Sequence, residues 1–253
     1  MIEQIKLWAI NTATRFFGNR SVINEHFVPK RGLDIHAYIK AKDATGAHHL
    51  VRYLWAQKVL ETHILKGPIL DIACGAGYGA FLLAQAFPSV HVVGADYDQT
   101  AIRYATKHYR LPNLEFRFGD VLHWQESVGA TQFFSVVSFD TIEHCRHREL
   151  MLENLVDHLM DDGLLLLSTP SGHSKNLLRP RWPHHMIEYS AASLYDLLSR
   201  YFQQVERSDE PGFPQRQIFD IFRNSGIAYH LWLNPVLCSA PIRVSNPYKP
   251  DNR

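Results

Sequence analysis

The sequence lacks an excess of charge of either sign. Among its 253 residues, 26 Lys and Arg side chains are balanced by 25 Asp and Glu side chains, which leaves a formal net charge of +1. The chain also has no run rich in Lys or Arg. Proteins that bind nucleic acid usually carry a basic patch, because neutralising phosphates releases counterions. The charge pattern therefore predicts no nucleic-acid partner and no strong attraction to an anionic membrane.

Cysteine is scarce as well. Cys74, Cys145 and Cys238 are odd in number and show neither the spacing of a zinc site nor that of a disulfide framework. Scattered free thiols are typical of a reducing compartment. No signal peptide is evident, and no apolar stretch approaches the roughly 20 residues that a membrane-spanning helix needs. We therefore expect a cytoplasmic protein without a transmembrane segment.

Composition divides the chain into three segments. Residues 1–66 are expected to form a mostly helical lead-in and partial lid, residues 67–207 an alternating β/α core, and residues 208–253 a proline-rich closing segment and tail. The first 17 residues are partly amphipathic. Packing on the core or on a second copy in a homodimer is the favoured explanation, and a membrane-surface helix is the alternative.

The most informative feature that is present is an apolar run that leads into an acid and three alternating glycines. It comprises residues 68–72 with Asp71, then Gly75, Gly77 and Gly79, then the apolar residues 80–87. This pattern predicts a buried strand, a tight turn and the start of a helix. Glycine lets the backbone approach a ligand, and the unpaired N–H groups of a helix start attract an anion. With Asp71 as acceptor for an ammonium group, the turn suits the amino-acid end of S-adenosylmethionine.

The glycine spacing separates this turn from a dinucleotide site. The NAD fingerprint is G-x-G-x-x-G, whereas this chain has G-x-G-x-G preceded by an acid. A tight βα turn without any ligand is the plainer alternative for this motif taken alone.

Acidic residues also end the next three predicted strands. Residues 90–95 are followed by Asp96, residues 114–119 by Asp120, and residues 133–139 by Asp140. Because ligands of open α/β sheets bind at the carboxyl ends of the strands, these acids would meet at a binding edge. With Asp71 they make four acids at strand ends, and core packing does not explain such a row.

Individual roles follow from this placement. Asp96 is suited to bond both ribose hydroxyls, and Tyr97 could lie against the adenine face. Asp120 could accept from the adenine amino group, and the N–H of Val121 could reach a ring nitrogen. The alternative for Asp96, capping of the next helix, is filled better by Asp98.

With these motifs the chain resembles the class I S-adenosylmethionine-dependent methyltransferases over about residues 48–207. Within that class it is similar to bacterial small-molecule methyltransferases of the ubiquinone-biosynthesis type, which also occur among glycan and natural-product enzymes. The resemblance rests on residues 70–79, 93–96, 119–120, 137–144 and 166–170. We expect the cofactor-binding residues to include Ala73, Gly75, Gly77 and Asp140.

The resemblance implies the fold. It predicts an α/β protein with a Rossmann-like, doubly wound, mostly parallel sheet of seven strands and an N-terminal helical extension. The antiparallel strand that closes such sheets is expected in residues 217–222 or in residues 227–233. In the family that the chain resembles, a His-x-x-x-Tyr segment lies over the methionine end of the cofactor. This segment is matched by His49 and Tyr53. Tyr53 is expected at the cofactor, while Arg52 fits the cofactor and the helix surface equally well.

Two segments could supply a base if the methyl acceptor is a hydroxyl. His144 follows the fourth predicted strand. His185 and Glu188 lie in a segment that resembles a family motif of the form Asn-Pro-Tyr-His-x-x-Glu-Phe. The motif is matched by Pro183, His185 and Glu188, and the departures from it are Trp182, His184 and Tyr189. Imidazole is a suitable base because it titrates near neutral pH. Local packing is the alternative for each histidine.

Asp140, Glu143 and His144 stand at i, i+3 and i+4, so on a helix they would share one face and could hold a divalent metal. A capping box, with Asp140 as cap and Glu143 at the third position, explains them more simply. We therefore predict no metal ligands and activity that survives chelation.

The sequence thus predicts methyl transfer from S-adenosylmethionine to a small-molecule acceptor. Oxygen is favoured over nitrogen because of the two histidine segments, and the acceptor classes are a sugar, a glycan precursor or a natural product. The alternatives are a quinone or phenol O-methyltransferase, an N-methyltransferase, and a catalytically inactive partner protein that binds the cofactor.

Overall fold

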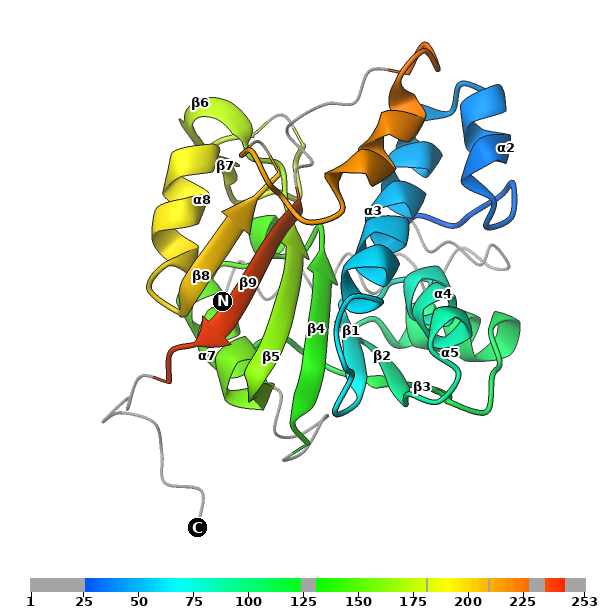
Figure 1. Ribbon diagram of the computed structural model, residues 1–253, viewed down its shortest axis with the longest axis horizontal. Coiled ribbons are helices and arrows are strands. Elements are labelled where there is room, and N and C mark those ends of the chain that lie inside the picture. Colours follow the sequence, from blue (N-terminus) through cyan, green and yellow to red (C-terminus); the bar gives the residue numbers. More distant parts are fainter. Residues whose placement is uncertain (1–25, 124–130, 181, 209, 228–234, 244–253) are drawn as a thin grey trace, which may run out of the picture.

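The computed structural model describes residues 26–123, 131–180, 182–208, 210–227 and 235–243. Helices and strands alternate along the chain (Figure 1). The helices are α2 Ile35–Lys40, α3 Ala44–Leu60, α4 Tyr78–Ala86, α5 Gln99–His108, α7 Arg148–His158 and α8 Ala191–Leu198, with the 3₁₀ helices η1 Ile142–His144 and η2 Arg216–Phe222. The strands are β1 Ile69–Ile72, β2 Val92–Asp96, β3 Leu114–Phe118, β4 Phe133–Phe139, β5 Leu159–Ser168, β6 Gly172–Leu177, β7 Glu188–Ser190, β8 Phe202–Arg207 and β9 Pro235–Pro241.

Seven of the strands form one sheet in the order β3-β2-β1-β4-β5-β9-β8. Strands β1 to β5 are parallel, and β9 runs antiparallel to both of its neighbours. The strand order reverses between β1 and β4. Ligands of open α/β sheets generally bind outside the carboxyl ends of the strands at such a point. The predicted doubly wound, mostly parallel sheet is confirmed, and α2 and α3 precede it as an N-terminal helical extension.

The closing strand is where the sequence prediction was wrong. Strand β9 lies between β5 and β8, whereas residues 217–222 belong to η2 and pack Phe219 and Phe222 against the core. In the other predicted segment, residues 228–233 lie outside the described residues. Pro235 and Pro241 at the two ends hid the strand, because proline inside a sheet removes a ladder hydrogen bond.

Apolar side chains cover both faces of the sheet, because successive side chains of a strand point to opposite faces. On one face, Trp55 of α3 and Leu83 of α4 pack with the aromatic residues of η2. On the other face, Leu155 of α7 and Leu198 of α8 form a second cluster. Figure 1 shows α3 and α4 in front of the sheet. The carboxyl ends of the strands, where the binding site is expected, therefore belong to a sheet that is packed on both faces.

Between β5 and α8 the chain makes an excursion over residues 172–190, here called the lid segment, built on the antiparallel pair β6 and β7. The N–H groups of Met186 and Ile187 donate to the carbonyl of Glu143 at 2.7 and 3.4 Å. The N–H of Tyr189 donates to the carbonyl of Pro170 at 3.1 Å. The lid segment is thus bonded to the chain just beyond β4 and β5, at the carboxyl edge of the sheet.

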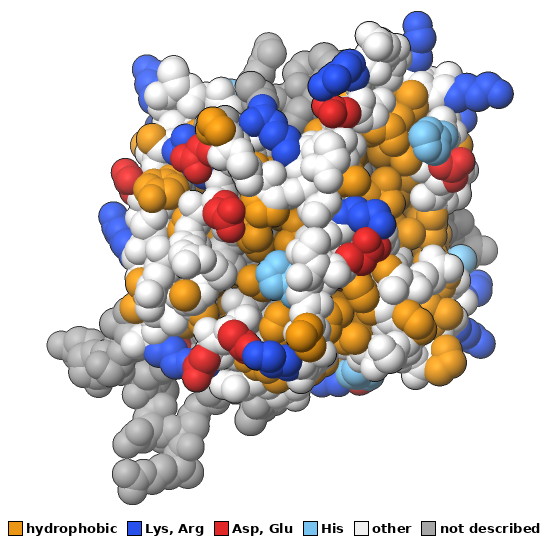
Figure 2. Space-filling model, viewed as in Figure 1, with side chains coloured by type: hydrophobic (Ala, Val, Ile, Leu, Met, Phe, Trp, Pro, Cys, Tyr) orange, Lys and Arg blue, Asp and Glu red, His pale blue; other side chains and the backbone are white. Residues whose placement is uncertain are grey.

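Basic and acidic side chains are interspersed on the face shown in Figure 2, as the balanced composition leads one to expect. Of the helices within the described ranges, none combines the length and apolar character of a bilayer-spanning segment. The amphipathic start that the sequence suggested falls within residues 1–25, outside the described residues.

Candidate active site

The turn after β1 is built on left-handed backbone. Ala73, Gly75 and Gly77 have φ values of 59, 54 and 82°. A left-handed Ala73 is uncommon, because its Cβ crowds the backbone, and such strain concentrates at functional sites. The N–H of Cys74 donates to the carbonyl of Ala95 at 3.0 Å, which ties the turn to β2. The turn delivers the chain directly into α4 after Gly77, so the N-terminus of α4 faces the site edge.

A side chain added at Gly75 would meet different neighbours from one added at Gly77. A Cβ at Gly77 would lie 2.4 Å from Ala105 Cβ and 2.7 Å from Phe116 Cε1. The missing side chain of Gly77 therefore makes room for the packing of α5 and β3 against the turn. A Cβ at Gly75 would lie 3.0 Å from Nδ1 of His26.

Sequence reasoning missed His26 and Phe27. Nε2 of His26 lies 3.3 Å from Oδ2 of Asp98. The ring of Phe27 stacks on His49 with centroids 4.5 Å apart. These contacts place the first described residues beside the glycine turn and α3. No local motif marks them, because both contacts are to residues distant in sequence.

Asp71 and Tyr53, which were each expected at the amino-acid end of the cofactor, contact each other. The Tyr53 hydroxyl lies 3.1 and 3.2 Å from the two carboxylate oxygens of Asp71, and both residues are buried. Burial raises the pKa of Asp71 to about 7, against the opposing hydrogen bond from Tyr53. Burial also raises the pKa of Tyr53 well above its usual value. A cationic group beside Asp71 would restore its charged form.

Asp96 joins the end of β2 to the glycine turn. Its oxygens accept from the N–H groups of Gly75 and Asp98, each at 2.8 Å. Each carboxylate oxygen keeps a further lone pair, the capacity that ribose hydroxyls would need. The neighbouring Tyr97 is 63% exposed. Asp98 caps α5 by accepting from the N–H of Thr100 at 2.7 Å, as predicted.

Asp120 and Val121 lie in the turn after β3. Oδ1 of Asp120 accepts from the N–H of Leu122 at 2.8 Å, and Oδ2 lies 3.2 Å from Nδ1 of His123. The carbonyl of Val121 accepts from Asn154 at 3.0 Å. The sheet order therefore brings the three predicted acids to the carboxyl ends of the adjacent strands β1, β2 and β3.

Asp140, at the end of β4, forms a bidentate ion pair with Arg52 of α3. The two N–O distances are 2.5 and 2.6 Å. Arg52 is only 2% exposed and also donates to Oγ of Ser168 at 2.8 Å. It is thus a buried link between α3, β4 and β5, and the surface alternative for it is wrong.

His49 shares this link. Its Nδ1 lies 3.0 Å from Nη2 of Arg52 and must accept, because a guanidinium only donates. Burial and the charge of Arg52 lower the pKa of His49 to about 4. The imidazole of His49 is therefore neutral at physiological pH.

The capping-box explanation for residues 140–144 is wrong. Helix η1 covers Ile142–His144, and its N-cap is Thr141, which makes no side-chain capping bond among the described residues. Asp140 is bound to Arg52 instead. Oε2 of Glu143 accepts from Oγ1 of Thr169 at 2.7 Å rather than reaching back to the helix start.

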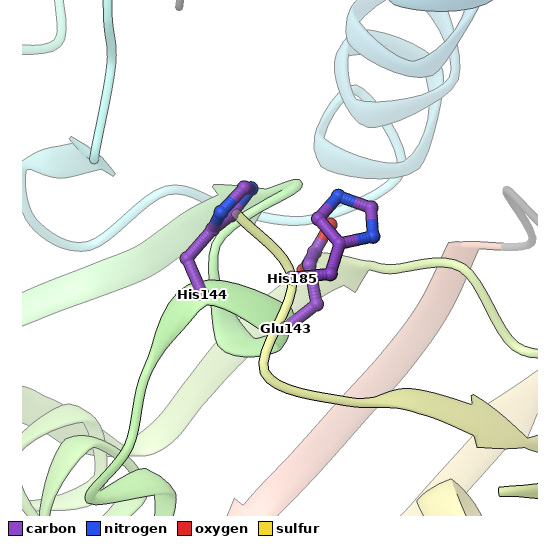
Figure 3. A group of neighbouring side chains, drawn as sticks. All are labelled: Glu143, His144 and His185. Atoms are coloured by element: carbon purple, nitrogen blue, oxygen red, sulfur yellow. The ribbon is translucent and has the colours of Figure 1, made fainter. Parts of the chain in front are cut away.

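Glu143, His144 and His185 gather at this point, here called the histidine cluster. Figure 3 shows Glu143 and His144 coming from the segment after β4 and His185 from the lid segment. One ligating atom of each lies within 4.8 Å of the others. The two imidazole rings meet at 84° with centroids 4.8 Å apart. The two candidate bases are thus neighbours, although they are far apart in the sequence.

In both imidazoles of the histidine cluster, Nδ1 already makes a hydrogen bond. Nδ1 of His144 lies 3.1 Å from the carbonyl oxygen of His184, and Nδ1 of His185 lies 2.7 Å from Oε1 of Glu188. The partners are acceptors, so both Nδ1 atoms carry a proton. In their neutral forms both rings therefore have their lone pair on Nε2. Glu188 is held from its other side by Nε2 of His173 at 2.8 Å.

Glu143 is buried more deeply than the histidines. It is 0% exposed, and its Oε1 has no hydrogen-bond partner among the described residues. Burial and the nearby charge of Asp140 raise the pKa of Glu143 to about 8. Burial, followed by the neighbouring His185, lowers the pKa of His144. These shifts set a buried carboxyl beside an exposed and a half-buried imidazole at the end of β4, and shifted pKa values of this kind are common at functional sites.

Known proteins with similar sequences include methyltransferases of several kinds. The trans-aconitate 2-methyltransferase of Sinorhizobium fredii is 36% identical over 104 residues, which cover 41% of this chain and 38% of that protein. A probable S-adenosylmethionine-dependent methyltransferase of Mycolicibacterium smegmatis is 28% identical over 162 residues, covering 63% of this chain and 57% of that protein. The chain thus matches between 38% and 57% of the length of these two relatives.

Solved structures share the fold at low sequence identity. The plantazolicin methyltransferase BpumL, in complex with S-adenosylhomocysteine, superposes with a TM-score of 0.60 at 13% identity and covers 81% of this chain and 89% of its own. The N-methyltransferase NodS of Bradyrhizobium japonicum gives 0.54 at 16% identity, with 91% and 96% covered. The [4+2]-cyclase SpnF also matches, with 0.53 at 14% identity and 79% and 83% covered. The fold alone therefore does not establish methyl transfer.

The family is established by the sequence match. A family model described as a methyltransferase domain matches residues 66–211, more than half of the chain. These residues include the glycine turn, the strand-end acids and the histidine cluster. The chain belongs to the class I S-adenosylmethionine-dependent methyltransferases.

Proposed function

We propose that the protein transfers the methyl group of S-adenosylmethionine to a hydroxyl oxygen of a small molecule, such as a sugar, a glycan precursor or a natural product. The observation that carries this proposal is the pair His144 and His185. Their Nδ1 atoms are bonded to acceptors, so two Nε2 lone pairs are available beside the end of β4. A hydroxyl needs such a base, whereas a neutral amine is already a nucleophile.

The cofactor would lie along the carboxyl ends of β1 to β3. Its amino-acid end would meet the glycine turn and Asp71, its ribose Asp96, and its adenine Tyr97, Asp120 and Val121. The methyl group would then point toward the end of β4. Much of the acceleration would come from holding the acceptor oxygen in line with the methyl carbon and sulfur.

In the transfer step, the acceptor oxygen forms a bond to the methyl carbon while the carbon–sulfur bond breaks and its electron pair goes to sulfur. The acceptor proton passes to Nε2 of His185. Glu188, 2.7 Å from Nδ1 of the same ring, orients the imidazole and stabilises the imidazolium that forms. His144 borders the same space and would help to position the acceptor.

The name of one relative, a trans-aconitate 2-methyltransferase, supports a small acceptor. A malonyl-[acyl-carrier protein] O-methyltransferase of Bacillus cereus, 30% identical over 125 residues, supports oxygen as the methylated atom, on a group that a protein carries. NodS, by contrast, is an N-methyltransferase, which keeps an amine acceptor as the second candidate.

Methyl-¹³C S-adenosylmethionine would test the proposal. The protein is incubated with panels of sugars, nucleotide-linked sugars, phenols and amines, and products are observed by carbon-detected NMR. We expect an O-methyl resonance that appears with wild-type protein and is strongly reduced with His185→Ala. Label found only in N-methyl products would contradict the proposal.

A further inference from the structure

We propose that the histidine cluster, Glu143, His144 and His185, is a binding site for a divalent cation, and that Zn²⁺ is the cation its chemistry favours (Figure 3). One carboxylate and two imidazoles converge from two separate segments of the chain. The ligating atoms already lie within 4.8 Å of one another. In a tetrahedral zinc site with bonds of about 2.1 Å, ligand atoms are about 3.4 Å apart. From 4.8 to about 3.4 Å, the most separated pair of ligand atoms would have to close by no more than about 1.4 Å.

The histidines are oriented as metal ligands usually are. Histidines that bind a metal through one ring nitrogen commonly donate the other N–H to a carbonyl or a carboxylate. His144 does so toward the carbonyl of His184 at 3.1 Å, and His185 toward Glu188 at 2.7 Å. His173 holds the far side of Glu188 at 2.8 Å. This outer set fixes which nitrogen of each ring is available to a cation.

Glu143 supplies the second, independent observation. A buried carboxylate oxygen without a partner is costly, and natural proteins rarely leave one. Oε2 of Glu143 is held by Thr169, while Oε1 has no hydrogen-bond partner among the described residues. A cation bound by both histidines would provide the missing partner.

The ligand set differs from the one that the sequence suggested. Asp140 is excluded, because both of its oxygens are bound to Arg52. His185 takes its place from the lid segment. Two imidazoles with one carboxylate favour Zn²⁺ over Mg²⁺ or Ca²⁺, which prefer oxygen ligands. Three protein ligands leave one position open, as in catalytic zinc sites.

The use of the cation rests on the proposed function. An acceptor hydroxyl at the open position would lose its proton more readily, because the cation stabilises the alkoxide. With the cation bound, His185 would be a ligand and could not act as the base. The acceptor proton would then pass to water, and the cation would activate the hydroxyl in place of the imidazole. A bound cation would also fasten the lid segment to the end of β4.

A zinc titration tests the site directly. Chelator-treated full-length protein is titrated with Zn²⁺ against a chromophoric competitor, without cofactor or acceptor. We expect one Zn²⁺ per chain. The variants Glu143→Gln and His185→Gln should bind it at least about tenfold more weakly, because even the loss of a residue that only hydrogen-bonds to a metal ligand typically lowers affinity by that factor. The matched control is His108→Gln, which removes an exposed histidine of α5 and should leave the affinity unchanged.

A second measurement distinguishes the loss of the zinc site from the misfolding of a variant. Zn²⁺ should raise the melting temperature of the wild-type and His108→Gln proteins and should leave that of Glu143→Gln unchanged. No stoichiometric Zn²⁺ binding by the wild type, or equal binding by all variants, would overturn the site. Since the titration uses neither cofactor nor acceptor, its failure would leave O-methylation standing, and a missing O-methyl product would leave the zinc result standing.

Discussion

Tyr53 on α3 and Asp71 on β1 form a buried hydrogen-bonded pair, with the hydroxyl 3.1 and 3.2 Å from the two carboxylate oxygens. The ring of Tyr53 also lies against Gly79, where a Cβ would come within 1.9 Å of it. The helical lead-in therefore forms one wall of the glycine turn. It also controls the charge of the carboxylate that is expected to receive the cofactor's ammonium group.

S-adenosylhomocysteine should bind more tightly as the pH rises toward 8. Asp71 has a pKa of about 7 in the free protein, and the ammonium group requires its anion. From pH 6 to pH 8 its ionised fraction rises about tenfold, and the association constant should rise by about the same factor. Calorimetry at several pH values measures this, and the Asp71→Asn variant should show no such rise. A flat profile in the wild type would exclude the ammonium role of Asp71.

The same pKa has a consequence for stability. The folded state binds this proton more tightly than the unfolded state does, so the stability of the free protein should fall as the pH rises from about 4 to about 7. Urea unfolding of wild-type and Asp71→Asn proteins should show a smaller fall in the variant.

Gly77→Ala should destabilise the protein more than Gly212→Ala. Both glycines have left-handed backbone, with φ of 82 and 84°, so both variants incur the same backbone strain. At Gly77 the new Cβ also meets Ala105 and Phe116, whereas at Gly212 nothing lies within 4 Å. Overpacking adds about 1–3 kcal/mol to the loss at Gly77. Equal losses in urea unfolding would show that packing does not require this glycine.

Breaking the ion pair between Arg52 and Asp140 should cost about 3–5 kcal/mol of unfolding free energy, because each single variant leaves a buried charge or its partner uncompensated. The variants are Arg52→Met and Asp140→Asn. In the double variant the loss should be smaller than the sum of the two. Additive losses would mean that the pair is not coupled.

His185→Ala should lower kcat by about 10²- to 10⁴-fold, the usual contribution of a general base. Its affinity for S-adenosylhomocysteine should stay nearly unchanged. His144→Ala should affect both quantities, because His144 follows the strand beneath the cofactor. Turnover and binding of the two variants are compared once an acceptor is found. Normal turnover by His185→Ala, with His144→Ala alone inactive, would move the base to η1.

The sequence predicted those features that depend on neighbouring residues. The glycine turn, the acids at strand ends and the cap at Asp98 are local patterns, and the structure contains each of them. The ion pair of Arg52 with Asp140 spans 88 residues, and no local pattern encodes such a contact.

Strand β9 and the grouping of the histidine cluster were also not predicted, for two different reasons. Strand β9 was missed because prolines bound it, although the sheet tolerates them at its two end positions. A shared helix face was considered for Asp140, Glu143 and His144, whereas His185 reaches Glu143 only through the fold of the lid segment. Spacing in sequence cannot show that a distant segment supplies the third member of the histidine cluster.

The cofactor site is proposed to be formed by the acids at the strand ends. Calorimetry with S-adenosylhomocysteine and NAD, on the wild type and on Asp96→Ala, tests it most directly. We expect one S-adenosylhomocysteine bound per chain and no binding of NAD. In Asp96→Ala we expect a loss of about 1–3 kcal/mol in binding free energy, the scale of a hydrogen bond to a charged group. Binding of NAD in place of S-adenosylhomocysteine, or an unchanged affinity in Asp96→Ala, would contradict it.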